Sequence, residues 1–123
     1  MNSYVLMLVL TAMTNGATSA AFVETANAGE CEMRLGRVLT ILNEATKKGS
    51  PAVSRSGCFA ATTRFQPFEH DTGETSPAHH YLIAIVDGRA EIGRQPDAAA
   101  CRDAMPTARG ERHCVQSRQS ITE

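Results

Sequence analysis

The chain has 123 residues, a length that fits one domain with a modest hydrophobic core. Hydrophobic residues make up 42% of the composition and charged residues 20%, which is typical of a folded protein and argues against global disorder. The formal net charge is -1 and the basic residues form no extended stripe, so we expect no nucleic-acid partner.

The first predicted element is Tyr4–Leu10, which is apolar at every position. This pattern is typical of a central strand that is covered on both faces. It is too short for a membrane-spanning helix, which needs about 20 apolar residues, so we expect no membrane span. Asn15-Gly16 suits a type I′ turn, and Thr18–Thr25 is predicted to be the second strand of a hairpin.

A long helix is predicted to follow, with Asn27 as its N-cap. Apolar residues recur at helical spacing and predict one buried face, formed by Cys31, Leu35, Val38, Leu39, Leu42 and Ala45. We expect this helix to end near Gly49. After a loop, Gly57–Ala61 is predicted to be a strand that carries Cys58.

Residues 66–80 are predicted to be a linker, because they contain two prolines, a glycine and many polar side chains. The same order of predicted elements then occurs a second time. A strand, a tight turn, a strand, a capped helix start and a closing strand are predicted at Tyr81–Val86, Asp87-Gly88, Arg89–Gln95, Asp97–Cys101 and His113–Gln116. Pro106 cannot continue a helix, so we expect the second helix to be short.

We therefore predict an α+β fold in a single domain, residues 1–123, built from two ββαβ repeats at residues 4–65 and 81–118. One helix is long and the other is short. The strands of each repeat are expected to pair antiparallel in the order second–first–third. The two units either stack face to face or join edge to edge and bury the remaining face in a homodimer, and the sequence leaves both arrangements open.

Four cysteines allow three disulfide connectivities, and the repeat selects Cys31–Cys58 and Cys101–Cys114. In each pair, the first turn of a helix is tied to the closing strand of the same repeat. Reduced buried thiols are one alternative. Metal or redox chemistry is another, although the sequence contains no Cys-x-x-Cys.

The two features that bear on localisation disagree. Disulfides imply export, and the apolar N-terminal stretch followed by small residues partly resembles a signal peptide. However, no Lys or Arg precedes the stretch, and cleavage near Ala20 would remove the first strand, so we expect it to be retained. The localisation is cytoplasmic if Tyr4–Leu10 is a core strand, and periplasmic or secreted if it is a signal peptide.

Candidate reactive residues are few. Three histidines lie in or beside the linker near three carboxylates, and these residues are His70, His79, His80, Glu69, Asp71 and Glu74. Histidine and carboxylate together can bind a divalent metal, but no helical spacing enforces a site, so we expect no metal and no cofactor. His113 and Cys114 are neighbours on a predicted strand and point to opposite faces, so we expect no catalytic dyad. The sequence contains no nucleophile elbow, P-loop or dinucleotide fingerprint.

The turn Asp87-Gly88, the helix start Asp97-Ala98-Ala99-Ala100-Cys101 and the strand dipeptide Cys114-Val115 form a recognisable pattern. It resembles that of small uncharacterised bacterial and phage proteins, in which a hairpin–helix–strand unit pairs a helix-start cysteine with a strand cysteine. The first repeat is less similar to this pattern, because Phe59 follows Cys58. The resemblance implies the fold and no established activity.

We expect a non-enzymatic binding or accessory module that acts through protein–protein contacts or self-association, at an exposed sheet edge or helix face. A secreted or periplasmic disulfide-stapled protein, such as an inhibitor, is one alternative. A small metal-dependent enzyme that uses the linker histidines is another.

Overall fold

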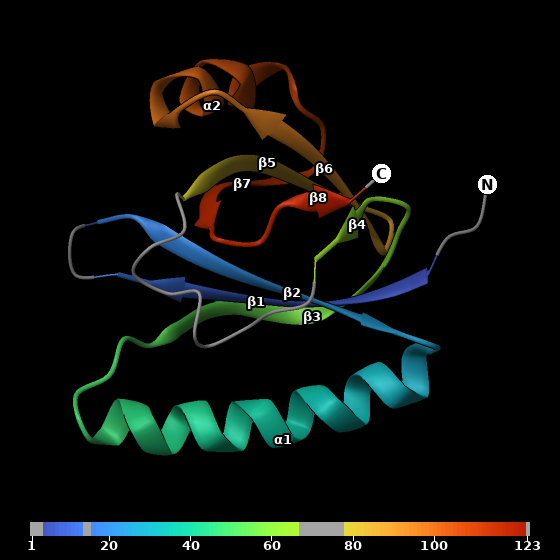
Figure 1. Cartoon of the computed structure of the whole chain (residues 1–123), viewed down its shortest axis with the longest axis vertical. Coiled ribbons are helices and arrows are strands. Elements are labelled where there is room, and N and C mark those ends of the chain that lie inside the picture. The colour runs from blue at the N-terminus through green and yellow to red at the C-terminus, as the bar shows by residue number, and fades with distance from the viewer. Residues whose placement is uncertain (1–3, 14–15, 67–77, 123) are drawn as a thin grey trace.

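The computed structural model describes residues 4–13, 16–66 and 78–122 of the chain. Six strands form a closed barrel in the order β1-β2-β7-β5-β6-β3. Their bounds are Tyr4–Ala12 (β1), Thr18–Thr25 (β2), Val53–Ala61 (β3), His79–Val86 (β5), Arg89–Gln95 (β6) and Glu111–Ser117 (β7). Two helices, α1 (Ala28–Lys47) and α2 (Ala98–Ala104), lie outside the barrel on opposite sides (Figure 1).

The position of β1 in the barrel explains why both of its faces are apolar. Leu6, Leu8 and Leu10 point into the barrel and are completely buried. The alternate residues Met7 and Val9 point outward and are buried on the outer face, which α1 covers (Figure 1). The prediction of Tyr4–Leu10 as a central core strand is therefore confirmed.

Both helices begin where the cap residues predict. The Asn27 side chain accepts a hydrogen bond from the backbone N–H of Glu30 at 2.8 Å, and Glu30 in turn accepts one from the N–H of Ala26 at 3.2 Å. The Asp97 carboxylate accepts a hydrogen bond from the N–H of Ala100 at 2.8 Å. A 3₁₀ turn at residues 105–107 follows α2, so the second helix is short, as Pro106 predicts.

Within each half of the chain, the strands pair antiparallel in the predicted order. The first half has β2-β1-β3 and the second half has β6-β5-β7. The two halves thus share one order of strands and helices, whereas their origin as a repeat remains a prediction. The half boundaries differ slightly from those expected, because β5 begins at His79 inside the predicted linker 66–80.

The way in which the halves join differs from both predicted arrangements. β2 pairs with β7 and β3 pairs with β6, and both pairings are parallel, so the sheet is mixed rather than antiparallel throughout. Each junction is registered through one residue pair, Ser19 with Gln116 and Ala60 with Arg89. The two units close on each other edge to edge at both sides. The sheet face for which the sequence predicts a stacked unit or a second subunit is therefore the interior of the barrel.

Three aromatic rings pack together in this interior. Phe22 and Phe65 stack with their centroids 4.0 Å apart, and the Tyr81 ring stands edge-on to both at 5.7 and 5.6 Å. Phe65 belongs to β4 (Arg64–Phe65), which pairs with β8 (Ile121–Thr122) in a small sheet of its own. The sequence does not predict this second sheet, because two-residue strands carry no periodicity.

The disulfides Cys31–Cys58 and Cys101–Cys114 are both present, and they are the two pairings that the sequence predicts. Each ties the first turn of a helix to the third strand of its half, so both helices are held against the barrel covalently. No helix within the described residues has the length and apolar character to cross a membrane.

Candidate functional site

Three charged side chains lie at partly exposed positions of the barrel where the strands elsewhere carry buried apolar ones. Arg55 on β3 lies opposite the buried Leu10 in register. Glu111 and His113 on β7 lie opposite the buried Ile85 and Ile83. Residues opposite each other in register point to the same face of a sheet, so these three side chains point toward the barrel axis. We call Arg55, Glu111 and His113 the barrel-mouth cluster.

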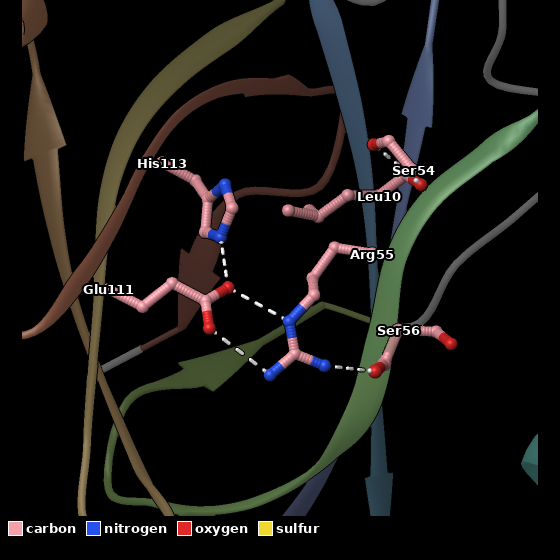
Figure 2. A network of polar contacts seen from close by, with 6 residues as sticks. All are labelled: Leu10, Ser54, Arg55, Ser56, Glu111 and His113. Carbon is pink, nitrogen blue, oxygen red and sulfur yellow. Dashed lines mark hydrogen bonds and ion pairs between the residues drawn. The ribbon is translucent and has the colours of Figure 1, made fainter.

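The cluster is a network centred on the Glu111 carboxylate (Figure 2). Arg55 donates to it in a bidentate manner, from Nε to Oε2 at 2.8 Å and from Nη2 to Oε1 at 3.2 Å. Nε2 of His113 contacts Oε2 of the same carboxylate. Arg55 also donates from Nη1 to the carbonyl of Ser56 at 2.6 Å, and its guanidinium lies 5.4 Å from the ring centroid of Phe59. The network thus links strands of the two halves that are not neighbours in the barrel.

These contacts fix the charge states of the carboxylate and the guanidinium. The hydrogen bond from Arg55, followed by that from His113, lowers the pKa of Glu111 to about 2, against a smaller opposing effect of burial. The hydrogen bond to Glu111 raises the pKa of Arg55. The three side chains are 27% to 38% exposed, so the cluster is screened by water and salt.

The arrangement favours a structural role for the cluster. Both oxygens of Glu111 already accept hydrogen bonds from within the chain. In the described part of the chain, no Ser, Thr or Cys side chain is hydrogen-bonded to His113, so the histidine is not placed to activate a nucleophile. The cluster is a set of polar contacts that joins β3 of the first half to β7 of the second half.

The sequence singled out only one member of this cluster. The sequence predicts that His113 and Cys114 point to opposite faces of their strand, and they do so on β7, where Cys114 forms its disulfide. Arg55 and Glu111 were missed, because a charged residue near the end of a strand is normally solvated. The sequence does carry one signal for Glu111 and His113. They lie four and two residues before the buried Val115, and alternate residues of a strand point to the same face.

The linker histidines do not converge in the described residues. His79 and His80 are adjacent on β5 and therefore point to opposite faces. Nδ1 of His79 lies 3.3 Å from Nη2 of Arg94, and burial, followed by the charge of Arg94, lowers its pKa. His70, Glu69, Asp71 and Glu74 lie outside the described residues. Across residues 4–13, 16–66 and 78–122, no three His, Cys, Asp or Glu side chains are grouped as a metal site requires.

The second candidate is the surface of α1 that faces away from the barrel. Of the 20 residues of α1, only Cys31 is fully buried, and the predicted stripe of Leu35, Val38, Leu39 and Leu42 is half-buried. Met33 is 55% and Ile41 67% exposed. Arg37 lies between them in sequence, four residues from each, so the three occupy successive turns on one side. We call Met33, Arg37 and Ile41 the α1 outer surface.

No protein-family model matches this chain, and it has no match among curated proteins or solved structures. The contacts of the two candidate surfaces differ in kind. In the barrel-mouth cluster, the polar groups of Glu111 are hydrogen-bonded to Arg55 and His113. On the α1 outer surface, two large apolar side chains face solvent, and Arg37 forms no ion pair with any described residue, whereas Arg34 is paired with Glu30 at 3.6 Å.

Proposed function

We propose that this chain is a non-enzymatic binding module that contacts another protein through the α1 outer surface. The observation that carries this proposal is the exposure of Met33 and Ile41 on a helix whose other side already covers the barrel. Complete burial of such a side chain contributes about 1.5–3 kcal/mol, so a partner that covers both gains a substantial hydrophobic contribution.

Barrel closure supports the choice of a helix face over a sheet edge. An exposed edge binds an extended peptide by adding a strand. Each of the six barrel strands has a neighbour on both sides, so the barrel offers no complete free edge for such an addition. The helix-face alternative is the one that this geometry favours.

The side chains of the surface specify the chemistry of the partner. Met33 and Ile41 are anchors for an apolar groove, in the manner of helix-in-groove recognition. Arg37 lies between the anchors and can form a bidentate pair with a carboxylate at the rim of that groove. We therefore propose a protein partner with an apolar groove and an acidic rim.

Three single-charge variants test this function. M33E and I41E each place a carboxylate within the proposed contact, and N43E adds the same charge to an exposed position of α1. Asn43 is two residues from Ile41 and does not share its face. We expect the unaltered chain and N43E to recover one stoichiometric partner from an extract of the source cell, and M33E and I41E to bind that purified partner at least tenfold more weakly. Equal binding by all four proteins would contradict the proposal, as would a strictly monomeric chain that recovers no partner.

The two disulfides favour a second function, that of a secreted or periplasmic disulfide-stapled protein such as an inhibitor. We propose it as the alternative. Its test is the intact mass of the protein taken directly from the source cell after alkylation of free thiols. A mass lower by four hydrogen atoms and without alkyl groups supports oxidation in the cell, whereas four alkylated cysteines would exclude it.

A further inference from the structure

A pocket of about 420 Å³ opens between α2 and the start of β2, beside the junction of the two halves. This volume lies within the range of small-molecule sites, which is about 300–1,000 Å³. Residues of β2, β5, α2 and β7 line the pocket, so it exists only because the two halves close on each other. The helix that lines it, α2, lies on the opposite side of the barrel from α1 (Figure 1).

Four polar residues from four different elements line this pocket. They are Thr18 on β2, His80 on β5, Arg102 on α2 and Gln116 on β7. The cysteines of the Cys101–Cys114 disulfide form part of the wall and add an apolar surface. None of the described lining residues is acidic.

The charge of the pocket comes from Arg102. This residue is exposed and forms no ion pair with the described part of the chain. The acids nearest to it in sequence do not line the pocket, and one of them, Asp97, is occupied by the N–H of Ala100. The guanidinium is therefore available to a ligand, and its planar fork matches a carboxylate or a phosphate.

We propose that this pocket binds a small organic anion, with Arg102 as the ion-pairing group. The shared chemistry is a carboxylate or a phosphate monoester on a compact apolar body. His80 and Gln116, which lie opposite each other in register on β5 and β7, supply hydrogen-bonding groups for the anion. The apolar body lies against the disulfide.

The disulfide also prepares the site. Arg102 directly follows Cys101, and Gln116 lies two residues after Cys114, so the covalent link holds the helix and the strand that carry them at a fixed separation. A site whose walls are fixed before binding loses less conformational entropy when the ligand arrives.

The test is an NMR titration of the oxidised, ¹⁵N-labelled full chain with phenyl phosphate, benzoate and uncharged benzyl alcohol, at constant pH and ionic strength. We expect saturable shifts of the amide signals of the lining residues with at least one of the two anions. R102Q is expected to weaken binding at least tenfold. R109Q removes the same charge from an exposed position outside the pocket and is expected to bind as the unaltered chain does.

Each outcome decides the matter. Preference for phenyl phosphate assigns the pocket to phosphate monoesters, preference for benzoate assigns it to carboxylates, and either supports the proposal. Shifts that do not saturate, equal binding of benzyl alcohol, or equal weakening by R102Q and R109Q would overturn it. Unchanged thermal unfolding of both variants confirms that the comparison concerns binding, since both side chains are exposed.

Discussion

The side-chain amide of Gln119 pairs with the backbone of Phe22 much as a neighbouring strand would. The N–H of Phe22 donates to Oε1 of Gln119 at 2.9 Å, and Nε2 of Gln119 donates to the carbonyl of Phe22 at 2.7 Å. The same Nε2 donates to the carbonyl of Gln66 at 2.7 Å. Gln119 is only 4% exposed, and it extends a junction between β2 and β7 that has one registered residue pair.

Loss of this amide is therefore expected to be costly. Q119A leaves the backbone groups of Phe22 and the carbonyl of Gln66 without their partner, and each buried group left unpaired costs about 1–3 kcal/mol. We expect the free energy of unfolding to fall by about 3 kcal/mol in urea titrations. A loss below about 1 kcal/mol would show that water replaces the amide.

Q119E is a sharper version of the same test. Its carboxylate can accept from the N–H of Phe22 but cannot donate to either carbonyl. Burial against two carbonyls raises the folded-state pKa of this introduced carboxyl, so the variant is more stable when the group is protonated. We expect the stability deficit relative to the unaltered chain to grow as pH rises from acid to neutral. A deficit that is independent of pH would contradict this account.

Glu111 predicts an acid-dependent loss of stability. Its pKa is about 2 in the folded protein, below the usual 4.5, so its contribution is present above pH 4.5 and is lost as the pH falls toward 2. We expect E111Q to flatten the fall of unfolding free energy over this window, measured by urea unfolding at a series of pH values. At neutral pH the loss should be about 1 kcal/mol or less, because the side chain is 38% exposed. E91Q, at an exposed position of β6, is the control and should retain the acid slope of the unaltered chain.

The two disulfides predict unequal effects on stability. The chain-entropy model gives about 3.5 kcal/mol for the loop closed by Cys31 and Cys58 and about 3 kcal/mol for that closed by Cys101 and Cys114, because their separations are 27 and 13 residues. Paired Cys→Ala variants measured by guanidinium unfolding should therefore lose stability in that order. A larger loss from the shorter loop would indicate that the native contacts of α2 matter more than loop entropy.

Replacement of two glycines by alanine is expected to change the stability of the protein in opposite directions. Gly110 has φ +76°, and an added Cβ would lie 2.3 Å from the carbonyl oxygen of Ile85, so G110A is expected to lower stability by more than about 3 kcal/mol. Gly36 lies within α1, and an added Cβ there meets nothing within 4 Å. G36A is expected to raise stability by about 0.5–1 kcal/mol in thermal unfolding. The same sign for both variants would contradict these assignments.

Local signals in the sequence predicted the elements well, because each had a local physical cause. Asp87 and Gly88 adopt φ values of 52° and 77°, as a type I′ turn requires. The N-caps Asn27 and Asp97 begin both helices. The spacing of the cysteines from those caps then gave the correct disulfide pairings.

Contacts between the halves could not be predicted in this way. The parallel junctions at Ser19 and Ala60 depend on geometry that develops only when both sheets are formed. Arg55 and Glu111 lie 56 residues apart, so the bidentate pair between them leaves no mark in the sequence near either residue. Gln119 lies beyond the predicted second repeat, where no periodicity marks it as buried.

Each covalent cross-link lies within one half, and none spans the thin parallel junctions between the halves. When the chain is stretched from its two ends, the halves should come apart first while the loops closed by the disulfides remain shut. A mechanical unfolding trace should accordingly show a shorter extension for the oxidised chain than for the reduced chain, because the residues inside both loops are shielded from the force.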